Sequence, residues 1–332
     1  MAANWMRRTV LSSVAAASVA LLAACGSSSV ANSVKPDSLV TFGDALSDLG
    51  QNPNGRPYSV TTTTTAINNW TLEVANQYDL TLAPAKQGGT AYAQGNARVA
   101  QADATGVTNA PSITAQIDSF LAANPSFGSK QFVLMSGGMS DIIAGYNEYA
   151  AGTKTKDAYL ADMATAGSLM GDQVIRLNKA GAPRIMVIGS QNLGRTLWAK
   201  DLDEAQEGAD PKPSKLLEDA TTAFNNALLL KVNAMDGRQV LYADVQYYFN
   251  RLTGDPSNYS FTNAKETLCN SVDASNGMNI GANQVNSSLC TDATLVTNEK
   301  IKQYLFADKI SYTPEAHRQL GTWIQDRMEA NW

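Results

Sequence analysis

Four short runs of consecutive apolar residues, separated by helical patterns, constrain the fold of this chain more than any other feature. They lie at 38–42, 131–135, 184–188 and 239–243. Consecutive apolar residues are typical of parallel strands that are covered on both faces. Because helical stretches alternate with these runs, we predict an α/β fold, a three-layer α/β/α sandwich around a mostly parallel, doubly wound sheet.

Helical periodicity accounts for much of the sequence between these runs. The stretches 157–180 and 214–235 predict long helices. Apolar residues that share one helical face predict two more, near 113–121 and 316–328. Since no repeat of fixed period and no linker divides the chain, we expect a single domain over residues 37–332.

The N-terminus has the pattern of a secretory signal. Arg7 and Arg8 precede an apolar run over 10–24, which has about the length of a signal-peptide core. The run is too short and too poorly flanked for a lasting transmembrane helix. It ends in Leu22-Ala23-Ala24-Cys25, which resembles the bacterial lipobox.

The lipobox resemblance implies cleavage before Cys25 and a thioether-linked diacylglycerol on that cysteine. Residues 1–24 are then a lipoprotein signal peptide, and 25–36 a lipid-anchored tether to the membrane of a bacterial cell envelope. Gly26 and not Asp follows the cysteine, which favours the outer membrane. An ordinary secretory signal with a chance cysteine is the alternative.

Two further cysteines, Cys269 and Cys290, enclose 20 residues rich in Asn, Ser and Gly. An exported chain meets an oxidising compartment, in which we expect a disulfide between them. Residues 250–300 have weak periodicity and predict a long excursion that this cross-link staples. The disulfide is expected to contribute about 3 kcal/mol by restricting the unfolded chain.

Charge and histidine content exclude two classes of protein. The chain has 25 basic and 30 acidic residues and a formal net charge of −5, whereas nucleic-acid binders usually show a basic balance. Its single histidine, His317, excludes a His-rich zinc site. We therefore expect no nucleic acid as a partner, and the sequence predicts no metal site and no cofactor.

The segment that follows the first apolar run, 42–50, reads Phe-Gly-Asp-Ala-Leu-Ser-Asp-Leu-Gly. It resembles the opening motif of the GDSL, or SGNH, hydrolases, a family of lipases and esterases with the usual text Phe-Gly-Asp-Ser-Leu-Ser-Asp-x-Gly. Active sites of α/β sheets lie at such places, past the carboxyl ends of strands. The resemblance puts the nucleophilic serine of the family at Ala45, and a methyl group cannot attack a carbonyl.

Two further blocks resemble the oxyanion-hole segments of the family. In 92–98, Gly95 keeps the first of two family glycines and Asn96 occupies the second, and the sequence leaves open which of them is the backbone donor. In 137–141, Ser140 stands where the family has its oxyanion asparagine. Losing one such donor typically costs about 2.7–4 kcal/mol of transition-state stabilisation.

The C-terminal block, 306–317, resembles the family pattern Asp-x-x-His-Pro-Thr-x-x-x-His. The match puts the triad acid at Asp308 and replaces the general-base histidine by Ser311. His317 matches the second histidine, which is not the base of the family. Because it begins a helix, we expect it at the surface or paired with the helix dipole.

Nucleophile, oxyanion asparagine and base are thus all replaced, by Ala45, Ser140 and Ser311. Three losses in different blocks predict an ester-hydrolase fold that is kept as a binding or interaction module on the cell envelope. Loss of the serine side chain would leave an unobstructed cleft for an acyl-ester, fatty-acid or glycan ligand.

Two alternatives stay open. One is an active lipid-anchored esterase or lipase with a remodelled site on Ser47 or Ser140, although a turn position such as that of Ser47 favours a capping role. The other is a purely structural envelope lipoprotein. Asp44 and Asp141 are expected to brace their turns by hydrogen bonding.

Overall fold

The structure is a computed structural model that describes residues 34–297 and 300–332. The chain divides into a unit of residues 1–34, of which only Val34 is described, and a second compact unit of residues 35–332. All that follows concerns the second unit.

The predicted targeting segment lies almost wholly outside the described residues. This holds for the signal peptide at 1–24, for Cys25 and for most of the tether at 25–36. Among the helices of the described ranges, none has the length and apolar character needed to span a membrane.

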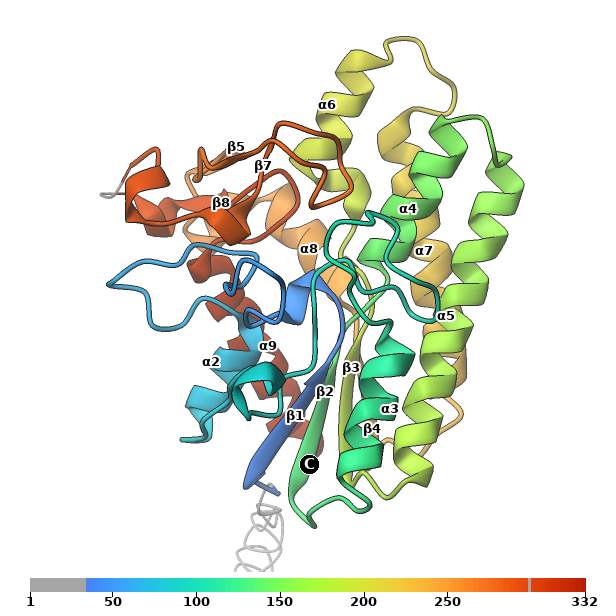
Figure 1. Ribbon diagram of the computed structural model, residues 1–332, viewed down its shortest axis with the longest axis vertical. Helices are drawn as coiled ribbons and strands as arrows, with labels where there is room; N and C mark the ends of the chain where they lie inside the picture. Colours follow the sequence, from blue (N-terminus) through green and yellow to red (C-terminus); the bar gives the residue numbers. More distant parts are fainter. Residues whose placement is uncertain (1–33, 298–299) are drawn as a thin grey trace, which may run out of the picture. The chain divides into compact units, whose positions relative to one another are not determined.

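The four predicted strands form one parallel sheet in the order β1-β2-β3-β4 (Figure 1). Their bounds are β1 (Ser38–Phe42), β2 (Gln131–Met135), β3 (Arg184–Ile188) and β4 (Val240–Ala243). The first three match the predicted runs residue for residue, and the fourth begins one residue later. The predicted α/β fold is therefore confirmed.

Helices pack on both faces of the sheet, because successive strand residues such as Leu39 and Val40 point to opposite sides. The helices that pack with Val40 are α3 (Ile113–Ala123), α4 (Met139–Ala150), α5 (Lys156–Lys179), α6 (Leu197–Ala205) and α7 (Pro213–Val232). Those that pack with Leu39 are α2 (Trp70–Gln77), α8 (Val245–Gly254) and α9 (Pro314–Asn331). Each helix group buries its own apolar cluster against the sheet.

Local signals set where the predicted helices begin. The Thr155 side chain accepts a hydrogen bond from the Ala158 N–H, so α5 starts one residue before its predicted start. α7 has Pro213 in its first turn, where a missing N–H leaves no helical bond unmade. Both helices lie within three residues of their predicted bounds.

A short parallel pairing extends the sheet beyond β1. The Tyr92 N–H donates to the Thr41 carbonyl at 2.8 Å, and the Thr41 N–H donates to the Thr90 carbonyl at 3.1 Å. The chain thus passes along one edge of β1 before it returns through α3 to β2 on the other edge. Ligands of open α/β sheets bind where the strand order reverses in this way, which directs attention to the carboxyl end of β1.

Residues 269–290, called the excursion below, are closed by the predicted disulfide between Cys269 and Cys290. Inside it, β6 (Val272–Asp273) pairs with β7 (Gln284–Val285) in antiparallel fashion. Just outside it, β5 (Asn263–Thr267) and β8 (Tyr304–Phe306) form a parallel pair. The rest of residues 269–290 has only turns and one single-turn helix, Ser287–Leu289. The whole stretch 250–300, predicted to be irregular, also contains the end of α8, the strand β5 and further single-turn helices.

We expect replacement of both cysteines, Cys269→Ser with Cys290→Ser, to lower the free energy of unfolding by about 3 kcal/mol, because the unfolded chain regains the entropy of an open loop. Urea unfolding of the variant and of the oxidised wild type measures the difference. Wild type under reducing conditions is the matched control and should unfold like the variant. Equal stability of oxidised wild type and variant would show that the cross-link does not stabilise the fold.

Candidate functional site

The chain turns sharply where β1 ends. Gly43 has a φ of +151°, and a Cβ there would lie 2.5 Å from a backbone carbonyl oxygen, so only glycine fits. A short 3-10 helix, Ala45–Ser47, follows with Asp44 as its N-cap. The Asp44 carboxylate accepts hydrogen bonds from the N–H groups of Leu46 at 3.3 Å and Met139 at 3.1 Å. Asp44 braces the turn as predicted, and burial raises its pKa to about 6.

Ala45 and Ser311 come together at this edge of the sheet. Each is 7% exposed, and both line a cavity of about 10 Å³, called the strand-end cavity below. Tyr58, Gln191 and His317 complete much of its wall. The structure therefore brings together two positions that the family resemblance aligned from opposite ends of the chain.

The strand-end cavity has no room for an ester, since about 10–15 Å³ is what a single water molecule needs. The expectation of an unobstructed cleft is thus wrong. Gln191 Oε1, Ser311 Oγ and the Tyr312 hydroxyl are buried without a hydrogen-bond partner among the described residues, and all three side chains line this cavity. Such atoms are rare inside proteins, and here they gather where the resemblance expects a nucleophile and its base.

Asp308, the position of the triad acid, is fully buried with both oxygens engaged. Its Oδ1 accepts from the backbone N–H groups of Ile310 at 2.9 Å and Ser311 at 2.7 Å. Its Oδ2 accepts from the N–H of Ser287 at 3.0 Å and from the hydroxyl of the same residue. The carboxylate that would orient a histidine therefore holds the excursion, to which Ser287 belongs.

The oxyanion positions do not share the strand-end cavity. Asn96 and Ser140 line a different cavity, also of about 10 Å³. The Gly95 N–H donates to Asp48 Oδ2 at 2.8 Å and is thus already engaged. The Asn96 side chain donates to the Gly277 carbonyl of the excursion at 2.6 Å. The resemblance expects all these groups around one reacting carbonyl, whereas the structure distributes them around two closed spaces.

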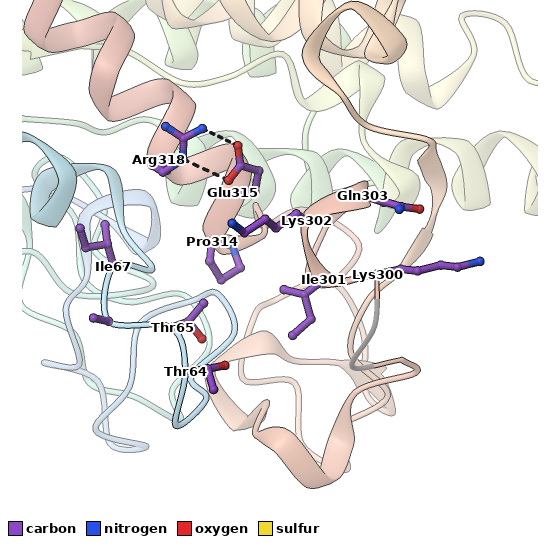
Figure 2. Close-up of a pocket in the computed structure, with 11 residues that line it drawn as sticks. Thr64, Thr65, Ile67, Lys300, Ile301, Lys302, Gln303, Pro314, Glu315 and Arg318 are labelled. Atoms are coloured by element: carbon purple, nitrogen blue, oxygen red, sulfur yellow. Dashed lines mark hydrogen bonds and ion pairs between the residues drawn. The ribbon is translucent and has the colours of Figure 1, made fainter.

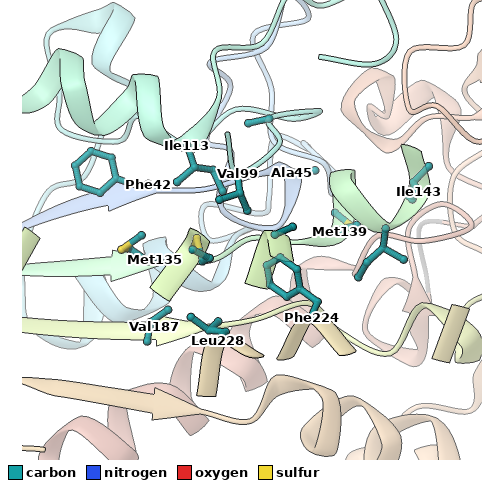
Figure 3. Close-up of a cluster of buried hydrophobic side chains, with 14 of the residues drawn as sticks. Phe42, Ala45, Val99, Ile113, Met135, Met139, Ile143, Val187, Phe224 and Leu228 are labelled. Carbon is teal, nitrogen blue, oxygen red and sulfur yellow. The ribbon is translucent and has the colours of Figure 1, made fainter. Parts of the chain in front are cut away.

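Apolar side chains of the excursion belong to the hydrophobic core. Met278 and Ile280 are buried in the same cluster as Ala45 and Met139. Figure 3 shows Ala45 and Met139 in this cluster. This packing removes apolar surface from water at the carboxyl end of the sheet. Met278 also lines the cavity of Asn96 and Ser140, so the excursion covers the oxyanion positions, whereas no residue of the excursion lines the strand-end cavity.

His317 is 1% exposed, so its expected surface position is wrong. It lies on the face of α9 that packs against α2, where its Nδ1 accepts from the Trp70 N–H at 3.2 Å. Burial lowers its pKa to about 3, although a hydrogen bond with the Tyr58 backbone opposes the shift. The imidazole is neutral at pH 7 and its acceptor nitrogen is engaged, which does not suit a general base.

Ser47 is fully buried as well. Its hydroxyl hydrogen-bonds with the Ser136 hydroxyl at 2.7 Å and accepts from Trp70 Nε1 at 3.0 Å. A nucleophile needs access to substrate and a base within hydrogen-bond reach. Ser47 is enclosed and bonded to groups that are not bases, so its role is structural, in keeping with its expected place in a turn.

Asp141 braces the start of α4 as predicted. It accepts from the Val99 N–H at 3.0 Å and lies 3.5 Å from Arg98 Nε. Burial raises its pKa to about 6, although the Arg98 guanidinium opposes the shift.

No group of three or more His, Cys, Asp or Glu side chains within the described ranges is arranged to hold a metal ion. Comparison of the chain with models of known protein families gives no match, and comparison with curated proteins gives none either.

Two residues that shape this site were not among the predicted site residues. Ser287 lies in an aperiodic polar stretch, and its bond to Asp308 depends on how the excursion folds back. Gln191 follows β3, a position that merits attention in any parallel sheet, and its Nε2 donates to the Ile310 carbonyl at 2.6 Å.

Proposed function

We propose that this chain is a catalytically silent relative of the SGNH hydrolases that acts as a binding or interaction module on a bacterial cell envelope. One observation carries the proposal: the strand-end cavity joins the nucleophile and base positions but presents only Ala45 and Ser311 there, in about 10 Å³. Acyl transfer needs a nucleophile, a base and room for the tetrahedral intermediate. The strand-end cavity offers none of these.

The envelope location rests on the N-terminal pattern. A lipid on Cys25 would hold the chain at the membrane, and Gly26 favours the outer membrane. The order of the four motif blocks along an α/β sheet supports SGNH ancestry and the doubly wound arrangement that goes with it.

The binding role rests on the unpaired polar atoms of the strand-end cavity. Gln191 Oε1, Ser311 Oγ and the Tyr312 hydroxyl retain hydrogen-bonding capacity that a polar ligand group would use. An acyl ester, a fatty acid or a glycan would reach them only after the walls of the strand-end cavity had moved apart. The closed state itself favours the second candidate, a structural envelope lipoprotein without a ligand in this cavity.

We expect the full chain to hydrolyse no p-nitrophenyl ester, short or long, above the background rate, and to take no label from a fluorophosphonate. Ester turnover is followed by absorbance, and labelled serines are mapped by mass spectrometry.

The matched control is Ser47→Ala, which should be equally silent. If the wild type hydrolyses esters and Ser47→Ala abolishes this activity, the site has been rebuilt and the proposal is wrong. A variant with Ala45→Ser, Ser140→Asn and Ser311→His tests the ancestry separately, since turnover by this variant requires that the family geometry is retained.

A further inference from the structure

A third and much larger cavity shares no lining residue with the strand-end cavity. It has a volume of about 590 Å³ and is called the side cavity below (Figure 2). Three segments that are far apart in the sequence form its walls: 64–67, 300–303 and the first turns of α9. Its volume falls in the range of about 300–1,000 Å³ that is typical of small-molecule sites.

Hydrogen bonds fix the walls of the side cavity. On one wall, residues 61–65 are all threonines and are called the threonine loop below. Thr62 Oγ1 accepts from the N–H groups of Thr64 and Thr65 at 3.3 and 3.0 Å, which shapes this loop. On the opposite wall the Gln303 N–H donates to the Lys300 carbonyl at 2.8 Å. Both rims are therefore ordered without a ligand, so binding would require little further loss of conformational entropy.

Apolar groups form much of the lining. Ala66 and Ile67 lie on one wall, and Ile301 and Pro314 lie opposite. In Figure 2 the Ile301 side chain points toward the threonine loop, across the cavity. An apolar ligand body would remove these surfaces from water, which stabilises a complex by about 25 cal/mol per Å².

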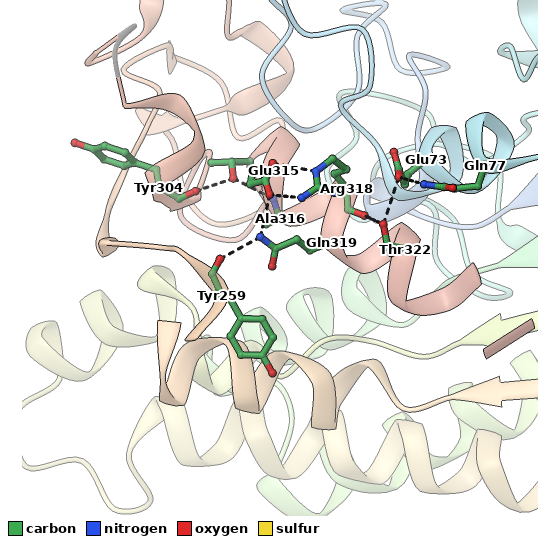
Figure 4. A network of polar contacts seen from close by, with 10 residues as sticks. Glu73, Gln77, Tyr259, Tyr304, Glu315, Ala316, Arg318, Gln319 and Thr322 are labelled. Carbon is green, nitrogen blue, oxygen red and sulfur yellow. Dashed lines mark hydrogen bonds and ion pairs between the residues drawn. The ribbon is translucent and has the colours of Figure 1, made fainter. Parts of the chain in front are cut away.

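The one acidic side chain among the described lining residues, Glu315, is paired within the protein. Its carboxylate accepts from Arg318 Nε at 3.0 Å, from Arg318 Nη2 at 2.6 Å and from Gln319 Nε2 at 3.0 Å (Figure 4). Partial burial raises the pKa of Glu315, but these hydrogen bonds outweigh it and hold the pKa below its ordinary value. Glu315 is thus a satisfied anion and does not attract a ligand cation.

Lys302 is one of three cations in the described lining, together with Lys300 and Arg318. It forms no ion pair with any carboxylate of the described residues. In Figure 2 its side chain extends toward Pro314, beside the Glu315–Arg318 pair, whereas the Lys300 side chain extends away from the cavity. The charge of Lys302 acts on Glu315 and helps to lower the pKa of that carboxyl, so the two groups lie within electrostatic reach. The described lining still has three cations against one carboxylate, and the side cavity therefore combines an apolar interior with a net positive wall.

We propose that the side cavity binds an amphiphilic carboxylate, with its apolar chain between Ile67 and Ile301 and its carboxylate at the Lys302 ammonium. Size, apolar lining and charge all match such a ligand. A neutral apolar molecule leaves the excess positive charge of the wall without a partner, and a small polar anion leaves the apolar walls uncovered. This site does not depend on the proposed loss of catalysis, because no residue of the strand-end cavity lines it.

Isothermal titration calorimetry of the full chain with octanoate tests the proposal, with butyrate and 1-octanol as the ligand controls. We expect octanoate to bind at least tenfold more tightly than butyrate, since each buried CH₂ contributes about 0.8 kcal/mol. It should also bind more tightly than 1-octanol, and increasing salt should weaken it.

Variants locate the site. Lys302→Gln should raise the Kd for octanoate about fivefold, the effect of losing one partly exposed ion pair. Lys300→Gln is the matched control on the same segment and should change the Kd less than twofold. The exposed Ala66→Trp fills the cavity from its rim without entering the core and should abolish binding.

Three results would overturn the proposal: no heat with octanoate up to millimolar concentration, equal effects of Lys300→Gln and Lys302→Gln, or full binding by Ala66→Trp. Ester turnover is measured separately, so failure of this site and failure of the proposed function are distinguishable.

Discussion

Asp308→Ala is expected to lower the free energy of unfolding by about 3–5 kcal/mol, because it removes a buried acceptor from four donors at once. Three backbone N–H groups and one hydroxyl point at this carboxylate. Water does not reach these donors to replace the carboxylate as their acceptor, since Asp308 is fully buried. Each donor left unsatisfied costs about 1–3 kcal/mol before the structure relaxes. Urea unfolding, with the midpoint and slope fitted together, measures the loss.

A matched series separates the carboxylate from its partners. Ser287→Ala removes a single hydroxyl donor and should cost only about 1 kcal/mol. Asp308→Asn keeps one acceptor oxygen, so its loss in the free energy of unfolding should lie between those of Asp308→Ala and Ser287→Ala. If Asp308→Ala proves no worse than Ser287→Ala, the carboxylate does not hold the excursion in place.

The Asp308 series also bears on function. In a working triad the acid leaves one oxygen for the histidine that it orients. Here the Ser287 N–H and hydroxyl take that oxygen and connect it to the excursion. A large loss of stability on removing Asp308 would mean that a residue at a catalytic position now stabilises the fold by holding the excursion in place.

The strands were predictable because their signal is local. A parallel strand covered on both faces needs consecutive apolar residues, and Gln131–Met135 or Arg184–Ile188 can hardly be anything else. The start of α5 was nearly as clear, since Thr155 is a good N-cap. The convergence of Ala45 with Ser311 followed from the rule that active sites lie at the carboxyl ends of strands.

The burial of Met278 and Ile280 was not predictable, because these two apolar residues lie in a polar segment. Met278 and Ile280 show no periodicity that would mark them as core, yet both are buried against the Ala45 cluster. Only a disulfide-closed loop that folds back over the sheet brings them there. The side cavity was not predicted either, since its walls come from segments 64–67 and 300–303, which are far apart in the sequence and meet only in the folded chain.

The burial of His317 was not predicted, because its place at the start of a helix was given more weight than the face of that helix on which it lies. It lies on the same face of α9 as Leu320 and Ile324, both buried against the sheet. A residue three before one apolar position and seven before another shares their face. The spacing was in the sequence and would have predicted burial.

The burial of His317 makes acid stability depend on this one imidazole. Its pKa is about 3 in the folded chain and 6.5 as an ordinary value. Between these values the unfolded chain holds a proton that the folded chain does not, so the contribution of His317 to stability falls as pH falls from 6.5 toward 3. Asp44 and Asp141 act in the opposite direction, since burial raises both pKa values to about 6 and the folded chain then binds more protons between pH 6 and 4.

A comparison of His317→Gln with the wild type isolates the histidine from these carboxylates. At pH 7 the variant should be about 1 kcal/mol less stable, because glutamine replaces the bond to the Trp70 N–H imperfectly. As pH falls from 6.5 to 4 the wild type should lose about 3 kcal/mol relative to the variant, so the order of stability reverses. Urea unfolding of both proteins across this range measures the difference, with Asp44→Asn as a control that should lack one of the opposing carboxylate contributions. A difference that stays constant with pH would mean that the imidazole titrates normally and is open to water, and the packing of α9 against α2 would then need revision.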